Sequence, residues 1–592
     1  MYLEKFIIKN FRAIEELELN FNKGLNILIG ENNSGKTAVI DAMRLCLGYY
    51  QKPRDIYCSP SDFRINKSEV SEELEKIEFD LFFKCDNEND ALFTDLLYLD
   101  DEGSYGLQLH FKHRLVDSKT SKRVKTRIWG GAKEGGRVDP DILSELSNVY
   151  LGALRDPKKN LKPNRYNILG NLYSSIILDK DVNKDREKKE ELLKKVKELF
   201  NGGDWKDFIN MGNERVIEHL EYLSYLTTQK KQDVKIDFVP FEFEKLLQNL
   251  IIQLPIYDDD LLDEDNNQRY FEIWQNGLGL NNLIYTAAVL GDIKQKKKKS
   301  GERYTLLLIE EPEAHLHPQL QSTFFNYLKE LNSKHEFQII VTSHSPTIAA
   351  KTDLNLLTIL QNNQNKICST QINDIGLDKN NLEFLQKFLD VTKSQLFFAN
   401  GVLLVEGISE ALLIPIFSKM LGEEYNIERN GIEVVNVNGV SFKHFAKLFF
   451  SDDEKKRLNC RCGIITDDDE GKKQEGRVQS ICELENNYLK PFFARKTFEY
   501  ELFLANNDNP SLLKVFSEIH PEIFKRISKE DDIEKKADIF VNALSKNKTK
   551  SDFSFKLSIE LEKDNNYKNF NVPCYIGKSI RFVVEGTEFE FE

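Results

Sequence analysis

One eight-residue segment, Gly30 to Thr37, restricts the possible folds of this chain more than any other feature of the sequence. It reads GENNSGKT and fits the P-loop pattern of glycine, four residues, glycine, lysine, and serine or threonine. The apolar stretch LNILIG precedes the segment and a stretch of helical spacing follows it, so the strand, loop and helix context agrees with the pattern. We therefore predict an α/β core that binds ATP with Mg²⁺.

The residues of the P-loop are expected to bind different parts of the ATP phosphates and the magnesium ion. Backbone N–H groups at Gly30, Asn33 and Gly35, together with the positive end of the following helix, are expected to hold phosphate. Lys36 is expected to neutralise the outer phosphates, and the Thr37 hydroxyl to reach magnesium.

Two further strand ends supply polar groups to the same predicted site. The apolar stretch 306–309 ends in Glu310 and Glu311. Glu310 stands where Asp is usual, and we expect it to hold magnesium through water, while Glu311 polarises the attacking water. His344 follows the stretch FQIIVTS and is expected to sense the terminal phosphate; a structural histidine is the alternative.

A glycine-rich turn at Asn276, Gly277 and Gly279 precedes a stretch of helical spacing, and the N-terminus of a helix is an anion site. Together with the P-loop, the Glu-Glu strand end and the histidine, this turn resembles the set found in ABC-type ATPases. In that family the turn contacts ATP bound to the other subunit, so the resemblance implies a nucleotide-sandwiched dimer. Asn276 stands where the family commonly has serine.

A group of carboxylates follows two predicted strands in the last third of the chain. Glu406 ends GVLLVEG, Glu410 lies in the first turn of the next helix, and Asp467 and Asp469 end CGIITDDDE. The carboxyl ends of parallel strands meet at one sheet edge, so these side chains are expected to converge. Hard oxygen ligands select Mg²⁺ or Mn²⁺, and a pair of such ions promotes phosphodiester cleavage. A solvated acidic strand end is the alternative.

This acidic unit resembles a Toprim domain, and the chain as a whole resembles the OLD family of ATP-dependent endonucleases. The resemblance rests on the motifs IGENNSGKT, LLIEEPEAHLHP, TSHSP and FFANGVLLVEGISE. It spans nearly all 592 residues. It implies catalytic roles for Glu499, in KTFEYEL, and for Lys550, which would neutralise the transition-state phosphate. Lys546, Lys548 and Lys556 compete with Lys550 for this role.

The resemblance also implies the organisation and the partners. We expect an ABC ATPase in two parts, 1–156 and 232–394, a helical and dimerising insert at 157–231, and a Toprim nuclease domain with a parallel sheet at 395–592. The partners implied are DNA and further copies of the chain, as a dimer or tetramer. Several members of the family act against bacteriophage, and a helicase encoded nearby would indicate a Gabija-type system.

The net charge, the apolar runs and the cysteines of the chain exclude some classes of function. Lys plus Arg number 82 and Asp plus Glu number 96, so the net charge is −14 and no global positive field attracts DNA. The lysine-rich run 294–299 is predicted to be a solvated loop, with a DNA-facing patch as the alternative. No apolar run is long enough for a membrane span, no signal peptide is recognised, and the eight cysteines form no disulfide framework, which predicts a cytoplasmic protein.

Three functions remain open at this stage. The first is a metal-dependent DNA endonuclease governed by ATP, with the direction of the ATP effect undecided. The second is a DNA-repair ATPase of the RecF or SMC type without nuclease activity, which leaves the acidic residues unexplained. The third is a topoisomerase or a primase. This function would predict a strand-cleaving tyrosine domain or a zinc-binding module, and the sequence shows no motif of either kind.

Overall fold

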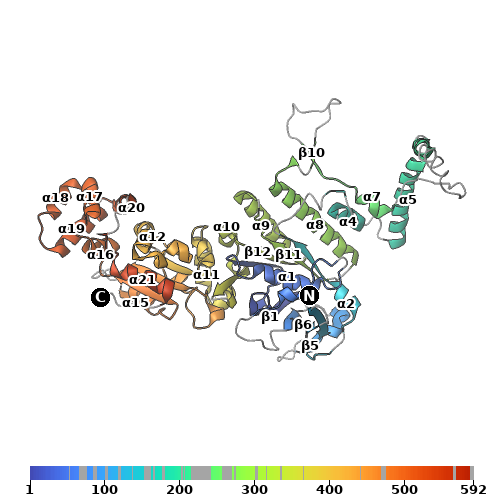
Figure 1. Ribbon diagram of the computed structural model, residues 1–592, viewed down its shortest axis with the longest axis horizontal. Coiled ribbons are helices and arrows are strands. Elements are labelled where there is room, and N and C mark those ends of the chain that lie inside the picture. The colour runs from blue at the N-terminus through green and yellow to red at the C-terminus, as the bar shows by residue number, and fades with distance from the viewer. Residues whose placement is uncertain are drawn as a thin grey trace, which may run out of the picture. The chain divides into compact units, whose positions relative to one another are not determined.

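The chain divides into two compact units in the computed structural model. Figure 1 labels the helices and strands. The first unit comprises Met1–Tyr150, Tyr304–Glu313 and Pro318–Glu592, and the second comprises Leu151–Arg303 and Ala314–His317. The structure describes residues 1–592 except for 52–53, 66–75, 85–89, 100–104, 118–121, 136–137, 153–161, 164–166, 177–180, 202–204, 206, 215–241, 256–269, 273–274, 301–303, 315, 334–336, 364–365, 440–441, 469–474, 564–568 and 587–592.

The first unit contains an antiparallel sheet in the order β2-β1-β4-β6-β5, with β7 also paired to β6. Buried and less buried residues alternate along β4, as expected for a sheet with one face on the core. The sequence predicts two strands in the first 50 residues, LEKFIIKNF and LNILIG, but the structure has a third, β2. The local pattern does not indicate β2, because glutamates separate its apolar residues. The strands are β1 (Tyr2–Phe11), β2 (Ile14–Asn20), β4 (Lys76–Lys84), β5 (Leu97–Leu99), β6 (Tyr105–Asp117) and β7 (Lys122–Gly130).

A second sheet of the same unit has the order β14-β13-β3-β12-β11-β8. Its strand β3 lies between β12 and β13 and is parallel to both, and β11 is parallel to β12. All six residues of β3 are buried, as expected for a strand covered on both faces. The strands are β3 (Leu25–Gly30), β8 (Leu146–Leu151), β11 (Tyr304–Glu310), β12 (Gln338–Ser343), β13 (Leu357–Asn363) and β14 (Lys366–Gln371).

Helix α1 (Lys36–Leu47) follows β3 and contributes ten buried residues, including Val39 and Leu45. These side chains share one apolar core with Phe6, Phe79 and Phe111 of the antiparallel sheet. The core therefore ties the P-loop helix to the first sheet. The other helices of this part are α2 (Pro140–Glu145), α9 (Pro318–Ser333), α10 (Pro346–Lys351) and α11 (Lys379–Phe388).

A third sheet, also in the first unit, is parallel throughout in the order β16-β15-β17-β18. Because β15 and β17 are neighbours, their carboxyl ends lie side by side. Its strands are β15 (Gly401–Val405), β16 (Ile432–Asn436), β17 (Arg461–Asp467) and β18 (Leu489–Ala494). The helices are α12 (Ile408–Leu421), α13 (Ile427–Asn430), α14 (Phe442–Ala446), α15 (Glu475–Cys482), α16 (Phe498–Ala505), α17 (Pro510–Ile519), α18 (Pro521–Ile527), α19 (Ile533–Lys546), α20 (Lys550–Glu562) and α21 (Cys574–Glu585).

The second unit is mainly helical where it is described. Helix α4 (Ile168–Ser175) packs on α8 (Leu278–Ser300) through a small core with Leu169 and Ala288. The lysine-rich run 294–299 was predicted to be a loop; it is instead the last part of α8, since Lys and Gln favour helix. The remaining elements are α5 (Val182–Asn201), α7 (Phe243–Leu247), β9 (Gln253–Pro255) and β10 (Tyr270–Glu272).

Within the described ranges, no helix is both long and apolar enough to cross a membrane.

Candidate functional site

The P-loop has the backbone conformation that its glycines and asparagine predict. Asn33 has φ of 62° and Gly35 has φ of 93°, both in the left-handed region. A Cβ at Gly30 would lie 2.1 Å from the Leu360 carbonyl oxygen, so a side chain at this position would collide with β13. Gly30 and Gly35 therefore permit a tight turn that no larger residue could make without strain.

Lys36 folds back over its own loop. Its Nζ donates to the carbonyl oxygens of Gly30 and Glu31 at 2.9 and 2.6 Å and to the Ser34 Oγ at 3.1 Å. Burial lowers the Lys36 pKa to about 8, although four nearby glutamates oppose this shift. A desolvated cation held by carbonyl groups is ready to exchange them for phosphate oxygens. Thr37, the next residue, is exposed.

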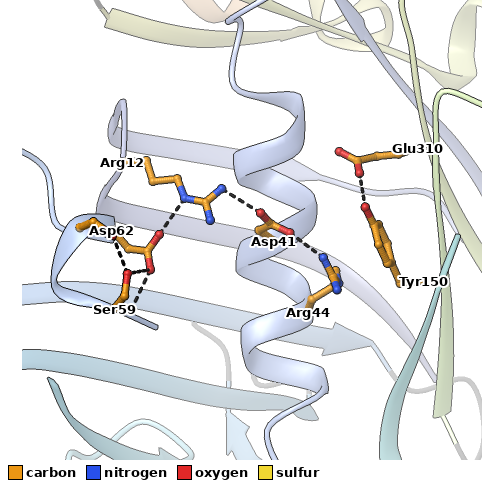
Figure 2. Close-up of polar contacts among 8 residues, drawn as sticks. Arg12, Asp41, Arg44, Ser59, Asp62, Tyr150 and Glu310 are labelled. Atoms are coloured by element: carbon orange, nitrogen blue, oxygen red, sulfur yellow. Dashed lines mark hydrogen bonds and ion pairs between the residues drawn. The ribbon is translucent and has the colours of Figure 1, made fainter. Parts of the chain in front are cut away.

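Glu310 is buried at the end of β11 and receives a hydrogen bond from the Tyr150 hydroxyl (Figure 2). The guanidinium of Arg44 lies 3.6 Å from the centre of the Tyr150 ring. Arg44 is itself fixed by Asp41 at 2.8 Å, and Asp41 also pairs with Arg12 at 2.8 Å. Glu310 is therefore oriented by a phenol that helix α1 holds in place. The sequence does not indicate a role for Tyr150, because no local spacing connects this residue with Glu310.

Glu311 and His344 lie together at the ends of neighbouring strands. The His344 Nε2 is 3.2 Å from the Glu311 Oε1, and Glu311 has a left-handed backbone with φ of 42°. Its N–H donates to the Thr342 carbonyl oxygen at 3.0 Å, which fixes this turn against β12. Burial and the charge of Lys36 lower the His344 pKa, so the imidazole is neutral at neutral pH and can exchange hydrogen bonds with a carboxylate or a phosphate.

The predicted glycine turn belongs to the second unit. Helix α8 begins at Leu278, so Gly279 lies in its first turn rather than before it, and Gly277 directly precedes the helix. The Asn276 Nδ2 donates to the Glu272 carbonyl oxygen at 3.1 Å. The turn is thus positioned by a local hydrogen bond at a helix N-terminus.

In the third sheet, the four predicted acids that the structure describes are Glu406, Glu410, Asp467 and Glu499. Glu406 directly follows β15 and its Oε2 accepts a hydrogen bond from the Thr466 Oγ1 at 3.1 Å. Asp467 ends β17 and its Oδ1 accepts from the Phe498 N–H at 2.9 Å. These contacts join the ends of β15 and β17 to the start of α16, where Glu499 lies.

Glu410 and Asp467 show how strongly the four carboxylates interact. Burial, with the charges of Glu499 and Glu406, raises the Glu410 pKa to about 7. Burial, with the charges of Glu406, Glu410 and Glu499, raises the Asp467 pKa to about 8. Negative charges are therefore brought together here at a cost in electrostatic energy, which is typical of a site that binds a cation.

Lys550 is the cation that faces this cluster. Its Nζ lies 2.8 Å from the Glu499 Oε2, and Glu499 is buried. Burial would lower the Lys550 pKa, but the charges of Glu499, Asp467 and Glu410 outweigh it and raise the pKa, so the ammonium form is favoured. The Lys550 ammonium therefore lies beside these acids.

The all-oxygen donor set fits a hard divalent cation by its chemistry. Within the described part of the chain, however, no group of three or more Asp, Glu, His or Cys side chains is arranged to hold a metal ion. Asp469, the remaining predicted ligand, lies outside the described residues. Metal binding would therefore need Asp469 or a rotation of the other carboxylates toward a shared centre.

Tyr575 of α21 is a further residue on which these acids act, and no sequence motif indicates it. Its hydroxyl is buried and has no hydrogen-bond partner among the described residues. Burial, with the charges of Asp467, Glu410 and Glu499, raises its pKa well above the ordinary value. The Tyr575 hydroxyl is therefore protonated and can still donate a hydrogen bond, and the negative charges of the acids act on it. Tyr575 is more than 100 residues from Asp467 in the sequence, so only the folded structure reveals that the two are related.

Two family models match the chain. The family described as "AAA domain, putative AbiEii toxin, Type IV TA system" matches residues 25–350, more than half of the chain. The family described as "Overcoming lysogenization defect protein-like, TOPRIM domain" matches residues 397–469. The predicted fold class is confirmed in its N-terminal P-loop ATPase and its C-terminal Toprim domain with a parallel sheet.

Curated relatives confirm the similarity to OLD-family nucleases. Endonuclease GajA of Bacillus cereus (strain VD045) is 25% identical over 463 residues, which cover 75% of this chain and 72% of that protein. The OLD nuclease of Thermus scotoductus (strain ATCC 700910 / SA-01) is 24% identical over 462 residues, covering 74% and 77%. Endonuclease GajA of Bacillus cereus (strain HuB5-5) is 25% identical over 335 residues, covering 46% of this chain and 48%, or about half, of that protein.

Proposed function

Because the chain belongs to the family of that AAA domain and continues into an OLD-like TOPRIM domain, we propose that it is an ATP-regulated, metal-dependent DNA endonuclease. The observation that carries the proposal is the set of four interacting carboxylates at the carboxyl edge of the third sheet, in a chain that also has a P-loop. The relatives named as nucleases support DNA as the substrate. A DNA-repair ATPase without nuclease activity leaves these carboxylates without a role.

The nuclease residues have distinct tasks in this proposal. Glu406, Glu410, Asp467 and Asp469 would hold Mg²⁺ or Mn²⁺, which supplies Lewis acidity and an activated water to phosphodiester hydrolysis. Lys550, held by Glu499 at 2.8 Å, neutralises charge that develops on the phosphate.

Tyr575 acts beside these charged groups. Its hydroxyl, which has no hydrogen-bond partner among the described residues, donates a hydrogen bond to the leaving or attacking oxygen. Because this phenol stays protonated, its donation does not depend on pH near neutrality.

ATP acts at the other site. Lys36 would exchange its carbonyl partners for phosphate oxygens. Thr37, and Glu310 through water, would hold the magnesium that accompanies ATP, and Glu311 would accept a proton from the attacking water. His344, 3.2 Å from Glu311, orients that group and contacts the terminal phosphate. We propose that ATP binding joins two copies of the chain through the turn at Asn276, Gly277 and Gly279, and that this closure changes the rate of DNA cleavage.

The remaining parts of the proposal concern biology. Several OLD-family nucleases act against bacteriophage, and we propose the same role for this chain, in the cytoplasm, as a dimer or tetramer. A helicase encoded nearby is the partner that a Gabija-type system would require.

Incubation of the purified chain with supercoiled plasmid tests the proposed activity. We expect nicking with Mg²⁺ or Mn²⁺, none in a chelator, and loss of nicking in Glu406→Gln. The matched control is Glu522→Gln, the same chemical change at an exposed residue that pairs with Lys525. Equal nicking by both variants, or full activity in the chelator, would reject the proposal.

A further inference from the structure

Basic side chains of three neighbouring strands lie side by side on the outer face of the antiparallel sheet. Phe79 and Phe111 of this sheet are buried in the core, so the residues that alternate with them along the strands point to the other face. On that face, Lys76 of β4 lies directly opposite Arg114 of β6. Arg114 in turn lies directly opposite Lys125 of β7.

Arg123 continues this arrangement along β7, because it lies two residues before Lys125 and therefore on the same face. Arg114, Arg123 and Lys125 are exposed, and Lys76 is partly exposed. Directly opposite residues of an antiparallel pair have Cβ atoms about 4.5 to 5.5 Å apart, and like charges at this distance destabilise the pair. These four cations, which we call the basic row, therefore repel one another unless an anion lies between them.

The acids of the same face do not neutralise the basic row. Glu78 pairs with Lys112 at 2.9 Å, and Glu134 pairs with Arg127 at 3.0 Å and with Lys112 at 3.8 Å. Hydrogen bonding by Arg127 and the charge of Lys112 lower the Glu134 pKa, and the charge of Arg114 adds a smaller contribution. Among the residues that the structure describes, no member of the basic row forms an ion pair with an acid.

A polyanion is the partner that matches an exposed row of unpaired cations. The net charge of −14 gives the chain no long-range attraction for DNA. The Debye length is about 8 Å at physiological ionic strength, so more distant charges are screened and the basic row dominates the local potential. Lysine and arginine on such a surface bind phosphates without reading the bases.

An acidic protein is the other partner of matching charge, and it fits the basic row less well. Protein interfaces place aromatic and apolar side chains at their centre and are depleted in lysine there. The centre of the basic row is Arg114, with Lys76 and Lys125 on either side. A surface with cations at its centre is typical of contact with a nucleic-acid backbone.

We propose that the basic row binds the phosphate backbone of duplex DNA, on a different sheet from the acidic edge at which cleavage is proposed. The identity of the polyanion rests on the proposed function, since that function makes DNA the substrate. The antiparallel sheet shares its core with the P-loop helix α1, so the ATPase part of the chain would itself hold DNA. Binding should be equal for duplexes of unrelated sequence, because phosphates carry no sequence information.

Fluorescence anisotropy of the full chain with labelled duplex DNA tests the proposal. The titrations are made in a chelator and without nucleotide, so that DNA is not cleaved, and at several salt concentrations. The test variant combines Arg114→Gln, Arg123→Gln and Lys125→Gln. We expect its dissociation constant at low salt to rise by at least about tenfold. The slope of log affinity against log salt should become shallower by about 2 to 3, because each lost phosphate contact removes about 0.9 from it.

The matched control makes the same change in net charge at exposed cations that have acidic partners. It combines Arg429→Gln, Lys525→Gln and Lys535→Gln, whose partners are Glu423, Glu522 and Asp532. We expect the control to keep the affinity and the salt slope of the parent. The test variant should melt at or above the temperature of the parent, because it loses like-charge repulsion. Arg123→Gln alone should reduce the slope by about 1, and it replaces the triple variant if that variant does not fold.

The outcomes separate the basic row from the proposed nuclease activity. The basic row is rejected if the parent does not bind duplex DNA, if the test variant binds it with unchanged affinity and salt slope, or if the control loses as much affinity. An acidic protein partner would give the second of these results. Plasmid nicking by the parent is measured separately with Mg²⁺. Binding that depends on the basic row without any nicking would reject only the nuclease, and nicking without such dependence would reject only the basic row.

Discussion

Replacing Asp467 with asparagine measures how much electrostatic energy the acidic cluster stores without a cation. The folded chain raises the pKa of Asp467, by burial and by neighbouring carboxylates, from its ordinary value of 3.8 to about 8. The folded chain therefore binds more protons than the unfolded chain between those two values. Stability contributed by this group is lost as the pH rises from about 4 to about 8.

The size of the effect follows from the shift. One unit of pKa corresponds to about 1.4 kcal/mol, so a shift of about four units sets a ceiling of about 6 kcal/mol at alkaline pH. The same repulsion also raises the pKa of Glu410, so the two carboxylates share it. We expect Asp467→Asn to stabilise the chain by about 2 to 3 kcal/mol at pH 8, since asparagine can still accept the hydrogen bond from the Phe498 N–H.

Differential scanning calorimetry in a chelator, at several values between pH 4 and pH 8, provides the measurement. At pH 8 the transition of the domain that contains Asp467 should rise by roughly 5 to 10 °C in the variant, and the difference should vanish toward pH 4. Magnesium should stabilise the parent more than the variant. The control is Asp538→Asn, an acid paired with Lys496 on the surface. A pH-independent difference, or a variant less stable than its parent at pH 8, would show that ionised Asp467 does not destabilise the folded chain.

Three further predictions concern single side chains. Tyr150→Phe removes the hydroxyl that orients Glu310, so the kcat of ATP hydrolysis should fall by about fivefold to tenfold with little change in KM; a change in KM alone would contradict a positioning role. Tyr575→Phe should slow plasmid nicking by about tenfold without lowering the melting temperature, because the lost hydroxyl has no partner among the described residues; unchanged nicking would exclude Tyr575 from the chemistry. Glu311→Gln should bind ATP but hydrolyse it slowly, and its nicking rate, measured across ATP concentrations, should change with ATP; a flat response with ATP bound would mean that the two sites are not coupled.

The parts of the fold that depend on residues close together in the sequence could be predicted from sequence patterns. The P-loop follows from a glycine, lysine and threonine pattern between a strand and a helix, and its backbone has the left-handed residues that such a turn needs. The positions of Glu406 and Asp467 follow from the strands that precede them, because parallel strands end at a common edge. Their roles, and those of the other acids, remain predictions.

Other features depend on contacts between residues far apart in the chain. Tyr150 donates a hydrogen bond to Glu310, and the charges of the acidic cluster act on Tyr575. Neither relation has a spacing that a sequence pattern could reveal. Strand β2 was missed because glutamates interrupt its apolar residues, yet pairing with β1 supplies the hydrogen bonds that the local pattern does not indicate. The sequence also predicts a strand in VKIDFVPFEF at 234–243 and a solvated loop at the acidic run 258–265. The first segment lies largely, and the second wholly, outside the described residues.

ATP hydrolysis and DNA nicking, measured on the same preparations of Lys36→Ala and Glu406→Gln, test whether the chain has two separate sites. Because ATP is proposed to bind at the P-loop and DNA to be cleaved at the edge of the third sheet, each variant should lose its own reaction. We predict that Lys36→Ala no longer binds or hydrolyses ATP, while its nicking in the absence of ATP equals that of the parent. Glu406→Gln should hydrolyse ATP normally and no longer nick plasmid. Loss of both reactions in either variant, with folding confirmed by its melting temperature, would contradict two separate sites.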